Sequence, residues 1–357
     1  MKITSSSIKH QTLQFKFEAG TSRGTLKEKD TWYLKLFSEN KLIGIGEAGP
    51  LKGLSTDPLE EMEAELEKVC ERLIGLEIPK SMEEAFETAK SISPEGFSSI
   101  RFAVETALLD AIHGGKKVIF NTPFYQGKER IPINGLIWMG SKEFMQKQIQ
   151  EKLEAGFNCI KMKIGAIDFQ TELKLLQSIR SKYSQSEITL RVDANGAFAP
   201  DEALEKLNEL AKLGLHSIEQ PIKAGQIKEM SKLCASTPLP IALDEELIGI
   251  RKLEKKITLL EDIKPQYIIL KPSLIGGIQS TLEWIRIAES MNIGWWMTSM
   301  LESNIGLNAI CQLASFLKVE MPQGLGTGQL YHNNISSPIS IANGETFYDA
   351  AKEWGEL

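Results

Sequence analysis

The chain has 357 residues, a net charge of -6 and four cysteines. This length suffices for a large core shared between a barrel and a smaller domain, while the negative charge and the lack of a Lys/Arg-rich run argue against nucleic acid as a partner. The N-terminus has no apolar stretch and the chain has no run of about 18 apolar residues. We therefore expect no signal peptide, no membrane span, a cytoplasmic location and reduced cysteines that serve as packing residues.

The N-terminal third predicts a small α+β domain. Strand-like runs at 15–17, 31–37 and 42–48 indicate an antiparallel sheet. Asp57 followed by Pro58 is typical of a helix start, and we expect Asp57 to cap the helix that follows. Apolar residues then recur at helical spacing: Leu59, Met62, Leu66, Val69 and Leu73.

A different pattern begins after a longer apolar helix, which we expect over about 98–112. From near Ile131 onward, short apolar runs alternate with helical segments such as 201–213, which Gly214 ends. The apolar runs read as buried parallel strands. Strands that alternate with helices in this way predict a parallel (β/α) barrel.

Charged residues stand at the ends of five of these runs and recur every 25 to 30 residues, which is the length of one strand, one helix and two loops. The five positions are Lys161 with Lys163, Asp193, Glu219, Asp244 and Lys271. The carboxyl ends of barrel strands meet at one rim, so we expect these side chains to gather there.

Strand geometry refines this expectation, because side chains alternate between two faces. Lys161 and Lys163 then share a face, as do Asp193 and Asn195 on the next strand. Three carboxylates from successive strands suit a hard divalent cation that prefers oxygen ligands, for which Mg²⁺ is the usual choice and Mn²⁺ a substitute. Taken singly, each carboxylate at a strand end is most often a helix cap or a solvated loop residue. The ordered set favours a metal site, since unpaired buried charges are costly.

The same residues resemble a known family. The quoted motifs are Lys161-Met162-Lys163, Asp193-Ala194-Asn195, Glu219-Gln220-Pro221, Asp244-Glu245 and Lys271-Pro272-Ser273. As an ordered set they resemble the enolase superfamily, and within it the muconate-lactonizing subgroup, which includes o-succinylbenzoate synthases, dipeptide epimerases and cycloisomerases.

The resemblance implies a fold and a division of the chain. It implies a (β/α)7β barrel over 126–328, capped by an N-terminal α+β domain over 1–125. The segment 329–357 would pack back toward the cap and complete it. Two cap loops, at 20–25 and 49–54, would close over substrate, which makes Arg23 and Lys52 candidate contacts for a distal carboxylate, although surface loops also carry such residues for solubility.

The resemblance also implies a chemistry. Asp193, Glu219 and Asp244 would hold Mg²⁺ against the substrate carboxylate, and Lys163 would remove the neighbouring proton to form an enediolate. Lys161 is a like charge on the same face, which favours the neutral amine of Lys163. Lys271 would be either a second base or a cation that stabilises the intermediate.

Two later segments bear on the substrate. The run 295–303 resembles the seventh-strand end of o-succinylbenzoate synthases, where Thr298 or Ser299 would bond the substrate, with Asn195 as a further contact. Dipeptide epimerases carry an Asp-x-Asp at the next strand end, but here both positions are glycine, Gly324 and Gly326. Glycine there also suits a turn or a close approach of substrate to the backbone.

Three functions remain open. The first is an o-succinylbenzoate synthase-type dehydratase, a lyase of menaquinone synthesis that loses water in a syn sense. The second is a dipeptide epimerase or N-acylamino acid racemase with Lys163 and Lys271 as two bases. The third is a barrel without activity, which the charge cluster argues against. In the first two the partner is a small-molecule carboxylate, and the pattern does not determine the oligomeric state.

Overall fold

The computed structural model describes residues 1–21 and 24–357. Its N-terminal part is an antiparallel sheet in the order β1-β2-β3. The strands are β1 (Ser5–Thr21), β2 (Gly24–Ser38) and β3 (Lys41–Ala48). The first two are much longer than the apolar runs that predicted them. The extra residues are mostly polar and face solvent, and they are held by cross-strand pairing that a hydrophobic pattern does not reveal.

Three helices cover one side of this sheet: α1 (Met62–Leu73), α2 (Met82–Ile92) and α3 (Ser98–Ile112). Helix α3 matches the expected range and lies directly on β3. A Cβ atom added at Gly46 would come within 1.9 Å of the Ala103 carbonyl oxygen, so only glycine permits this approach.

Asp57 corrects a sequence prediction. We expected it to cap the helix that follows it, but the 3-10 turn Leu59–Glu61 that leads into α1 has no side-chain cap. Instead Asp57 Oδ1 accepts a hydrogen bond from the Ser99 backbone N–H at 2.9 Å. The carboxylate therefore serves the start of α3, where N–H groups lack partners within the helix.

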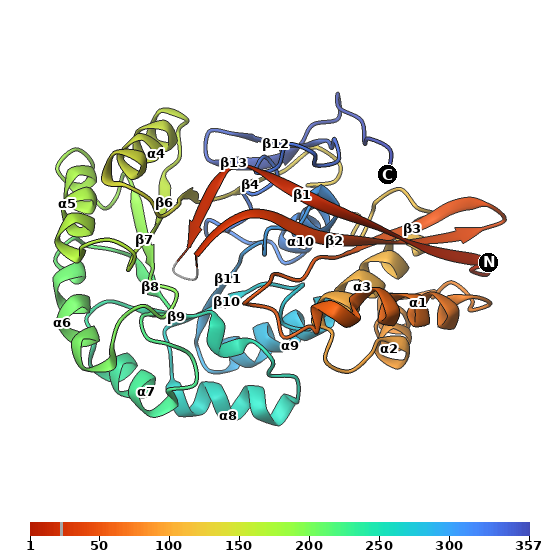
Figure 1. Ribbon diagram of the computed structural model, residues 1–357, viewed down its shortest axis with the longest axis horizontal. Helices are drawn as coiled ribbons and strands as arrows, with labels where there is room; N and C mark the ends of the chain where they lie inside the picture. The colour runs from red at the N-terminus through yellow and green to blue at the C-terminus, as the bar shows by residue number, and fades with distance from the viewer. Residues whose placement is uncertain (22–23) are drawn as a thin grey trace.

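A parallel barrel forms the larger part of the molecule (Figure 1). Among the described residues, its sheet has seven strands in sequential order: β5 (Gly135–Ile137), β6 (Cys159–Lys163), β7 (Thr189–Asp193), β8 (Ser217–Glu219), β9 (Ile241–Leu243), β10 (Tyr267–Leu270) and β11 (Gly294–Met297). A helix follows each strand: α4 (Lys142–Glu154), α5 (Phe169–Arg180), α6 (Pro200–Ala211), α7 (Ile227–Ser236), α8 (Leu253–Ile263), α9 (Gly277–Ser290) and α10 (Asn304–Phe316). The short turn Glu245–Leu247 precedes α8.

The ring is closed by the segment at 323–324, which forms parallel bridges to both sheet edges. Gln323 pairs with Ile133 on one side, and Gly324 pairs with Thr298 on the other. The eighth strand of the barrel is thus only two residues of bridging, with no helix after it. The expected (β/α)7β architecture is confirmed.

The segment at 130–132 pairs outside the barrel, just before the barrel sheet begins near the expected Ile131. Strand β4 (Arg130–Pro132) pairs with β13 (Glu345–Tyr348), which forms a hairpin with β12 (Ile339–Ala342). The barrel sheet starts three residues later, at β5. The same C-terminal region also reaches the cap, where the His332 N–H donates to the Gln14 carbonyl oxygen at 2.8 Å.

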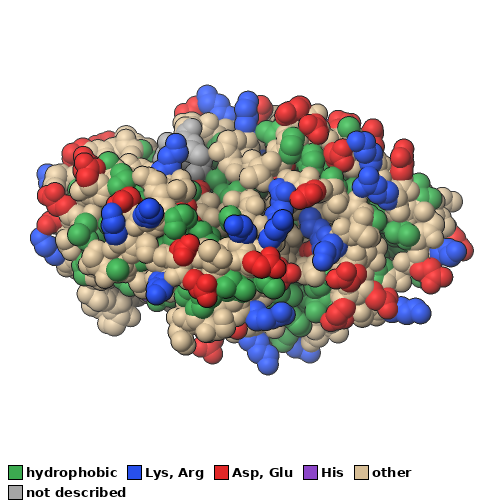
Figure 2. All heavy atoms as spheres, turned by 90° about the horizontal axis from the view of Figure 1, so that it is seen from below, with side chains coloured by type: hydrophobic (Ala, Val, Ile, Leu, Met, Phe, Trp, Pro, Cys, Tyr) green, Lys and Arg blue, Asp and Glu red, His purple; other side chains and the backbone are tan. Residues whose placement is uncertain are grey.

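The long β1–β2 ribbon places the cap over the barrel. It extends from the cap across to the barrel mouth (Figure 1), and Gly20 near its tip bridges Met139 after β5. Basic and acidic side chains are interspersed on the face drawn in Figure 2. In the part of the chain that is described, no helix has the length and apolarity needed to cross a membrane.

Candidate active site

Three buried carboxylates lie at neighbouring strand ends. Asp193 ends β7, Glu219 ends β8 and Asp244 directly follows β9, with exposed fractions of 1%, 2% and 2%. The parallel register sets Asp193 beside Glu219. Asp193, Glu219 and Asp244 therefore occupy one sector of the rim, because their strands are adjacent in the sheet and end at the same level.

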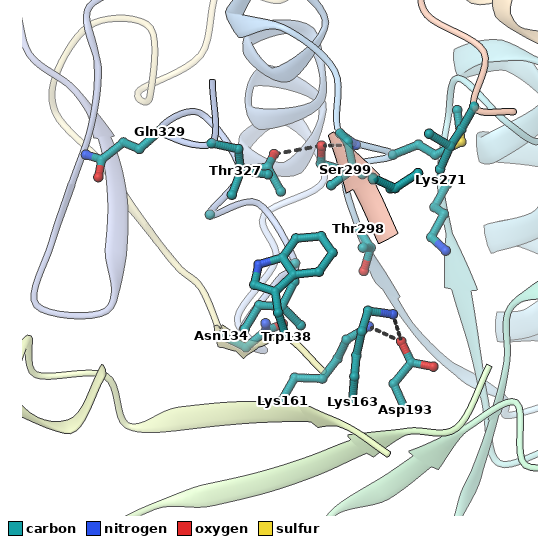
Figure 3. Close-up of a pocket in the computed structure, with 18 of the residues that line it drawn as sticks. Asn134, Trp138, Lys161, Lys163, Asp193, Lys271, Thr298, Ser299, Thr327 and Gln329 are labelled. Atoms are coloured by element: carbon teal, nitrogen blue, oxygen red, sulfur yellow. Dashed lines mark hydrogen bonds and ion pairs between the residues drawn. The ribbon is translucent and has the colours of Figure 1, made fainter. Parts of the chain in front are cut away.

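Two lysines from β6 reach this sector together. Lys161 Nζ lies 2.6 Å from Glu219 Oε2 and 3.1 Å from Asp193 Oδ2. Lys163 Nζ lies 2.9 Å from the same Asp193 oxygen and 2.7 Å from Asn195 Oδ1. Figure 3 shows both ammonium groups converging on Asp193. The two lysines share a face, as strand alternation requires.

Lys271 approaches from the other side of the site (Figure 3) and donates to Asp244 Oδ2. Asn195 links the two halves of the rim, because its side-chain amide also donates to Glu245 Oε1 at 3.1 Å. Asn195 has a φ of 43°. Asparagine tolerates this left-handed conformation better than most residues, and here it turns the chain so that the amide stays at the rim.

The electrostatics of the cluster follow from burial and close charges. Burial opposes the charged form of Asp193, but the neighbouring Lys161 and Lys163 outweigh burial and hold its pKa below the usual range. Burial and the Asp193 charge instead raise the pKa of Glu219. Burial works against the ammonium group of Lys161, yet Asp193 and Glu219 raise its pKa. The negative charges of these carboxylates thus repel one another, which favours the binding of a further positive charge between them.

The donor set can be tested against a divalent cation. It consists of carboxylate oxygens, which Mg²⁺ prefers, and Glu219 Oε1 is buried with no hydrogen-bond partner in the described structure. As placed, no three His, Cys, Asp or Glu side chains of residues 1–21 and 24–357 come close enough to hold an ion. Lysine ammonium groups bond the other carboxylate oxygens instead. The chemistry of these carboxylates fits Mg²⁺, and Glu219 Oε1 is the oxygen that is free to act as a metal ligand.

A cavity of about 730 Å³ opens above Asp193, Lys163 and Lys271 and lies between the barrel rim and the cap. The cap supplies apolar walls through Phe17, Leu26, Leu51 and Leu54, and the barrel supplies Trp138 and Leu136. Lys52 also lines the cavity. Arg23 lies outside the described residues. A space of this size holds a small organic molecule.

Four rim residues on the β11 side complete the cavity wall: Thr298, Ser299, Gly324 and Thr327. Thr298 Oγ1 is buried and has no hydrogen-bond partner within the described chain. Ser299 differs, because its hydroxyl donates to Glu302 Oε2 at 2.5 Å and accepts from the Leu301 N–H at 3.0 Å. Of the two expected substrate contacts, Thr298 is the one with a hydroxyl left to offer.

Thr298 explains why position 324 is a glycine. A Cβ atom at position 324 would lie 2.5 Å from Thr298 Oγ1, whereas one at Gly326 would meet nothing closer than 3.4 Å. The two glycines therefore differ in what they permit. Gly324 makes room for the side chain of Thr298, whereas a side chain at position 326 would meet no close neighbour.

Sequence reasoning missed several residues of the site. Asn134 lines the cavity with its side-chain oxygen unpartnered in the described structure, and Trp138 forms part of the apolar wall. Thr327 and Glu302 were also not assigned. The local signal at Glu302 was a charge directly after the apolar run Trp295–Leu301, which suggests a buried carboxylate.

Comparison with known proteins places this geometry in a wider group. Residues 144–351 match the family described as Enolase C-terminal domain-like. The chain is 45% identical to o-succinylbenzoate synthase of Desulfotalea psychrophila, over 95% of this chain and 97% of that protein. It is 29% identical to N-succinylamino acid racemase of Thermus thermophilus, over 93% of this chain and 87% of that protein. The crystal structure of MenC from Desulfotalea psychrophila superposes with a TM-score of 0.84 at 41% identity, covering 97% of this chain and all of that one.

Proposed function

The chain belongs to the enolase superfamily, and from this premise we propose that it is a lyase of the o-succinylbenzoate synthase type, acting in menaquinone biosynthesis. The observation that carries the proposal is the 45% identity to such an enzyme along nearly the full length of both chains. The partner is a small-molecule carboxylate, and the cavity of about 730 Å³ has the size for it. We place the enzyme in the cytoplasm, as the sequence led us to expect.

Asp193, Glu219 and Asp244 are the residues that would hold Mg²⁺. When bound, the ion supplies positive charge at the substrate carboxylate, where negative charge builds up as the α proton leaves. The unpartnered Glu219 Oε1 supports this assignment. Mn²⁺ accepts the same donors and would substitute.

Lys163 is the proposed base. Its ammonium nitrogen lies at the rim beside Asp193 and Asn195 and faces the cavity. In neutral form it takes the proton α to the carboxylate and leaves an enediolate. The same amine, now protonated, then donates to the departing β-hydroxyl on the same face, which gives syn loss of water and an aromatic product. Lys161 keeps positive charge beside it, held by Glu219 and Asp193.

Lys271 stands across the cavity from Lys163 (Figure 3). In a dehydratase it stabilises the enediolate by its charge, with Asp244 as its partner. Thr298, Asn195 and the backbone at Gly324 would contact substrate at the rim, and Lys52 is the described cap residue suited to a distal carboxylate.

The test is direct incubation with the hydroxycyclohexadiene precursor of o-succinylbenzoate and Mg²⁺, with absorbance followed as the ring becomes aromatic. Turnover that disappears in Lys163→Met supports the proposal. Failure of the wild-type enzyme to form the aromatic product would contradict the proposal.

A second candidate has its own support, because Lys163 and Lys271 face one cavity from two sides, as a two-base racemase requires. N-succinyl amino acids incubated in D₂O would then gain deuterium at the α carbon. Deuterium uptake without aromatisation of the precursor would favour the racemase over the dehydratase. Uptake together with aromatisation would mean that one site performs both reactions.

A further inference from the structure

A buried carboxylate behind the cavity wall joins several strand ends. Glu302 is fully buried and accepts hydrogen bonds from the hydroxyls of Ser273 and Ser299. Ser273 stands two residues after Lys271, and Ser299 follows β11 and lines the cavity. Glu302 therefore ties the loop that carries a proposed active-site lysine to the wall of the substrate cavity.

The hydroxyl of Ser299 is completely used by the protein. A serine hydroxyl has one proton and two acceptor lone pairs. The proton goes to Glu302 Oε2, and one lone pair accepts from the Leu301 N–H. The remaining contact is Thr327 Oγ1 at 2.8 Å, so Thr327 must be the donor. The chain of hydroxyls then runs in one direction, from Thr327 through Ser299 to Glu302.

This direction has a consequence inside the cavity. Thr327 lines the cavity wall, but its only proton is committed to Ser299. What it offers a ligand is a pair of acceptor lone pairs. The complementary ligand group is a hydrogen-bond donor, such as a hydroxyl or a bridging water, and a carboxylate oxygen would be repelled there.

A buried lysine of the cap lies in the same region. Lys29 of β2 has no hydrogen-bond partner for its ammonium in the described structure, and burial lowers its pKa, while the charges of Glu47 and Glu302 act in the opposite direction. Burial and the charge of Glu47 raise the pKa of Glu302, and Lys29 and the two serine hydroxyls act against this rise without reversing it. A Cβ atom at Gly49 would lie 2.4 Å from Lys29 Nζ, so the ammonium packs against the start of the loop that lines the cavity with Leu51 and Leu54.

We propose that Glu302 is a positioning residue that fixes the direction Thr327 to Ser299 to Glu302 and makes Thr327 an acceptor-only contact for substrate. The inference rests on the proposed function for its choice of substrate.

The variant Glu302→Gln tests the direction with little change of shape. Glutamine has one acceptor oxygen and a donor amide, so only one of the two serines can still donate to it. We expect KM for the precursor to rise about tenfold with a smaller change in kcat, because the lost contact serves binding. Thr327→Val should raise KM similarly. In the Thr327→Val background, Glu302→Gln should add less than about twofold, since its effect acts through that hydroxyl.

The matched control is Glu105→Gln, which removes another fully buried carboxylate, one that accepts the Ile278 N–H at the start of α9. It should lower Tm while KM stays within about twofold of wild type. Glu302→Gln with unchanged KM, or KM losses that multiply in the double variant with Thr327→Val, would overturn the proposal. An equal KM increase in Glu105→Gln would also overturn it, since any buried carboxylate would then serve.

If wild type leaves the precursor unchanged, the proposed function fails by itself, and the KM cycle is then run on deuterium uptake by N-succinyl amino acids.

Discussion

Thr298 fills the space that a side chain at position 324 would need. Its Oγ1 lies 2.5 Å and its Cγ2 2.8 Å from where a Cβ of residue 324 would stand. The two residues belong to adjacent strands, joined by a parallel bridge at the closing seam of the barrel. Only a glycine at position 324 thus leaves the space that the hydroxyl of Thr298 occupies.

Gly324→Ala should therefore damage both the fold and the reaction. The added methyl must displace Thr298 or the strand, so we expect a loss of about 1–3 kcal/mol in the free energy of unfolding and a fall in kcat/KM of at least tenfold. Gly326→Ala is the control, because its nearest neighbour would be Ile133 Cδ1 at 3.4 Å. Chemical denaturation and steady-state kinetics measure the two effects. Equal losses in both variants would contradict this account of the seam.

The two lysines that face the cavity should fail in different ways. Lys163→Met removes the proposed base, so kcat should fall by about 10²–10⁴-fold and deuterium exchange at the α carbon should disappear. Lys271→Arg retains a positive charge near Asp244 and should keep part of the activity in a dehydratase, whereas Lys271→Met should lose more. If both Lys271 variants abolished activity equally while Lys163→Met retained proton exchange, the assignment of the base would be reversed.

The barrel was predictable from the sequence because its strands are short, buried on both faces and evenly spaced. A charge at the ends of five of the strands marked the rim, and Asp193 and Glu219 do lie side by side there. Helix α3 was equally predictable, since it is apolar around much of its surface. The roles assigned to the rim residues stay predictions, because position at the rim does not establish chemistry.

What the sequence did not reveal depends on pairs that are distant along the chain. Asp57 caps a helix 42 residues away in the chain, and the residues at 130–132 pair with the C-terminal hairpin just before the chain enters the barrel. Glu47 accepts the Ser303 N–H, 256 residues further along. No local periodicity encodes such partners. The one available signal was a charge within or beside an apolar run, as at Glu47 and Glu302, which predicts burial but not the partner.

The protein should become less stable toward unfolding in acid because of His216. Burial, followed by the nearby Arg191 charge, lowers its pKa to about 4, and its ring packs against Tyr267 with centroids 5.0 Å apart. The folded state thus disfavours the proton that the unfolded chain accepts near pH 6.5. Stability from this residue is complete above pH 6.5 and is lost as the pH falls toward 4.

His216→Asn should therefore flatten the acid side of the stability curve. His216 is only partly buried, so we expect its share of the loss between pH 7 and pH 4.5 to be about 1–2 kcal/mol. Denaturation of wild type and variant at both pH values gives the difference directly. The exposed His332 provides the control, and His332→Asn should follow the wild-type curve. A wild-type curve that His216→Asn leaves unchanged would show that this ring does not titrate with folding.

Mg²⁺ should stabilise the protein through the three rim carboxylates. An ion that binds only the folded state adds about 2.7 kcal/mol when its concentration is about 100 times Kd, so Tm should rise on addition of Mg²⁺ and fall back with a chelator. Glu219→Gln keeps the shape but removes the charge of the residue with the unpartnered oxygen. The variant should lose the Mg²⁺-dependent rise, and with it the catalytic activity.

Glu219→Gln measured without Mg²⁺ also separates the effect of the Glu219 charge on stability from the effect of Mg²⁺ binding. Burial and Asp193 raise the pKa of Glu219, so a neutral glutamine relieves repulsion and should leave the metal-free Tm equal to or above that of wild type, despite the lost contact with Lys161. The control Glu229→Gln alters a carboxylate on the exposed side of α7, paired with Lys232, and should retain the full Mg²⁺ response. A Tm rise with Mg²⁺ that persists in Glu219→Gln would place the ion elsewhere.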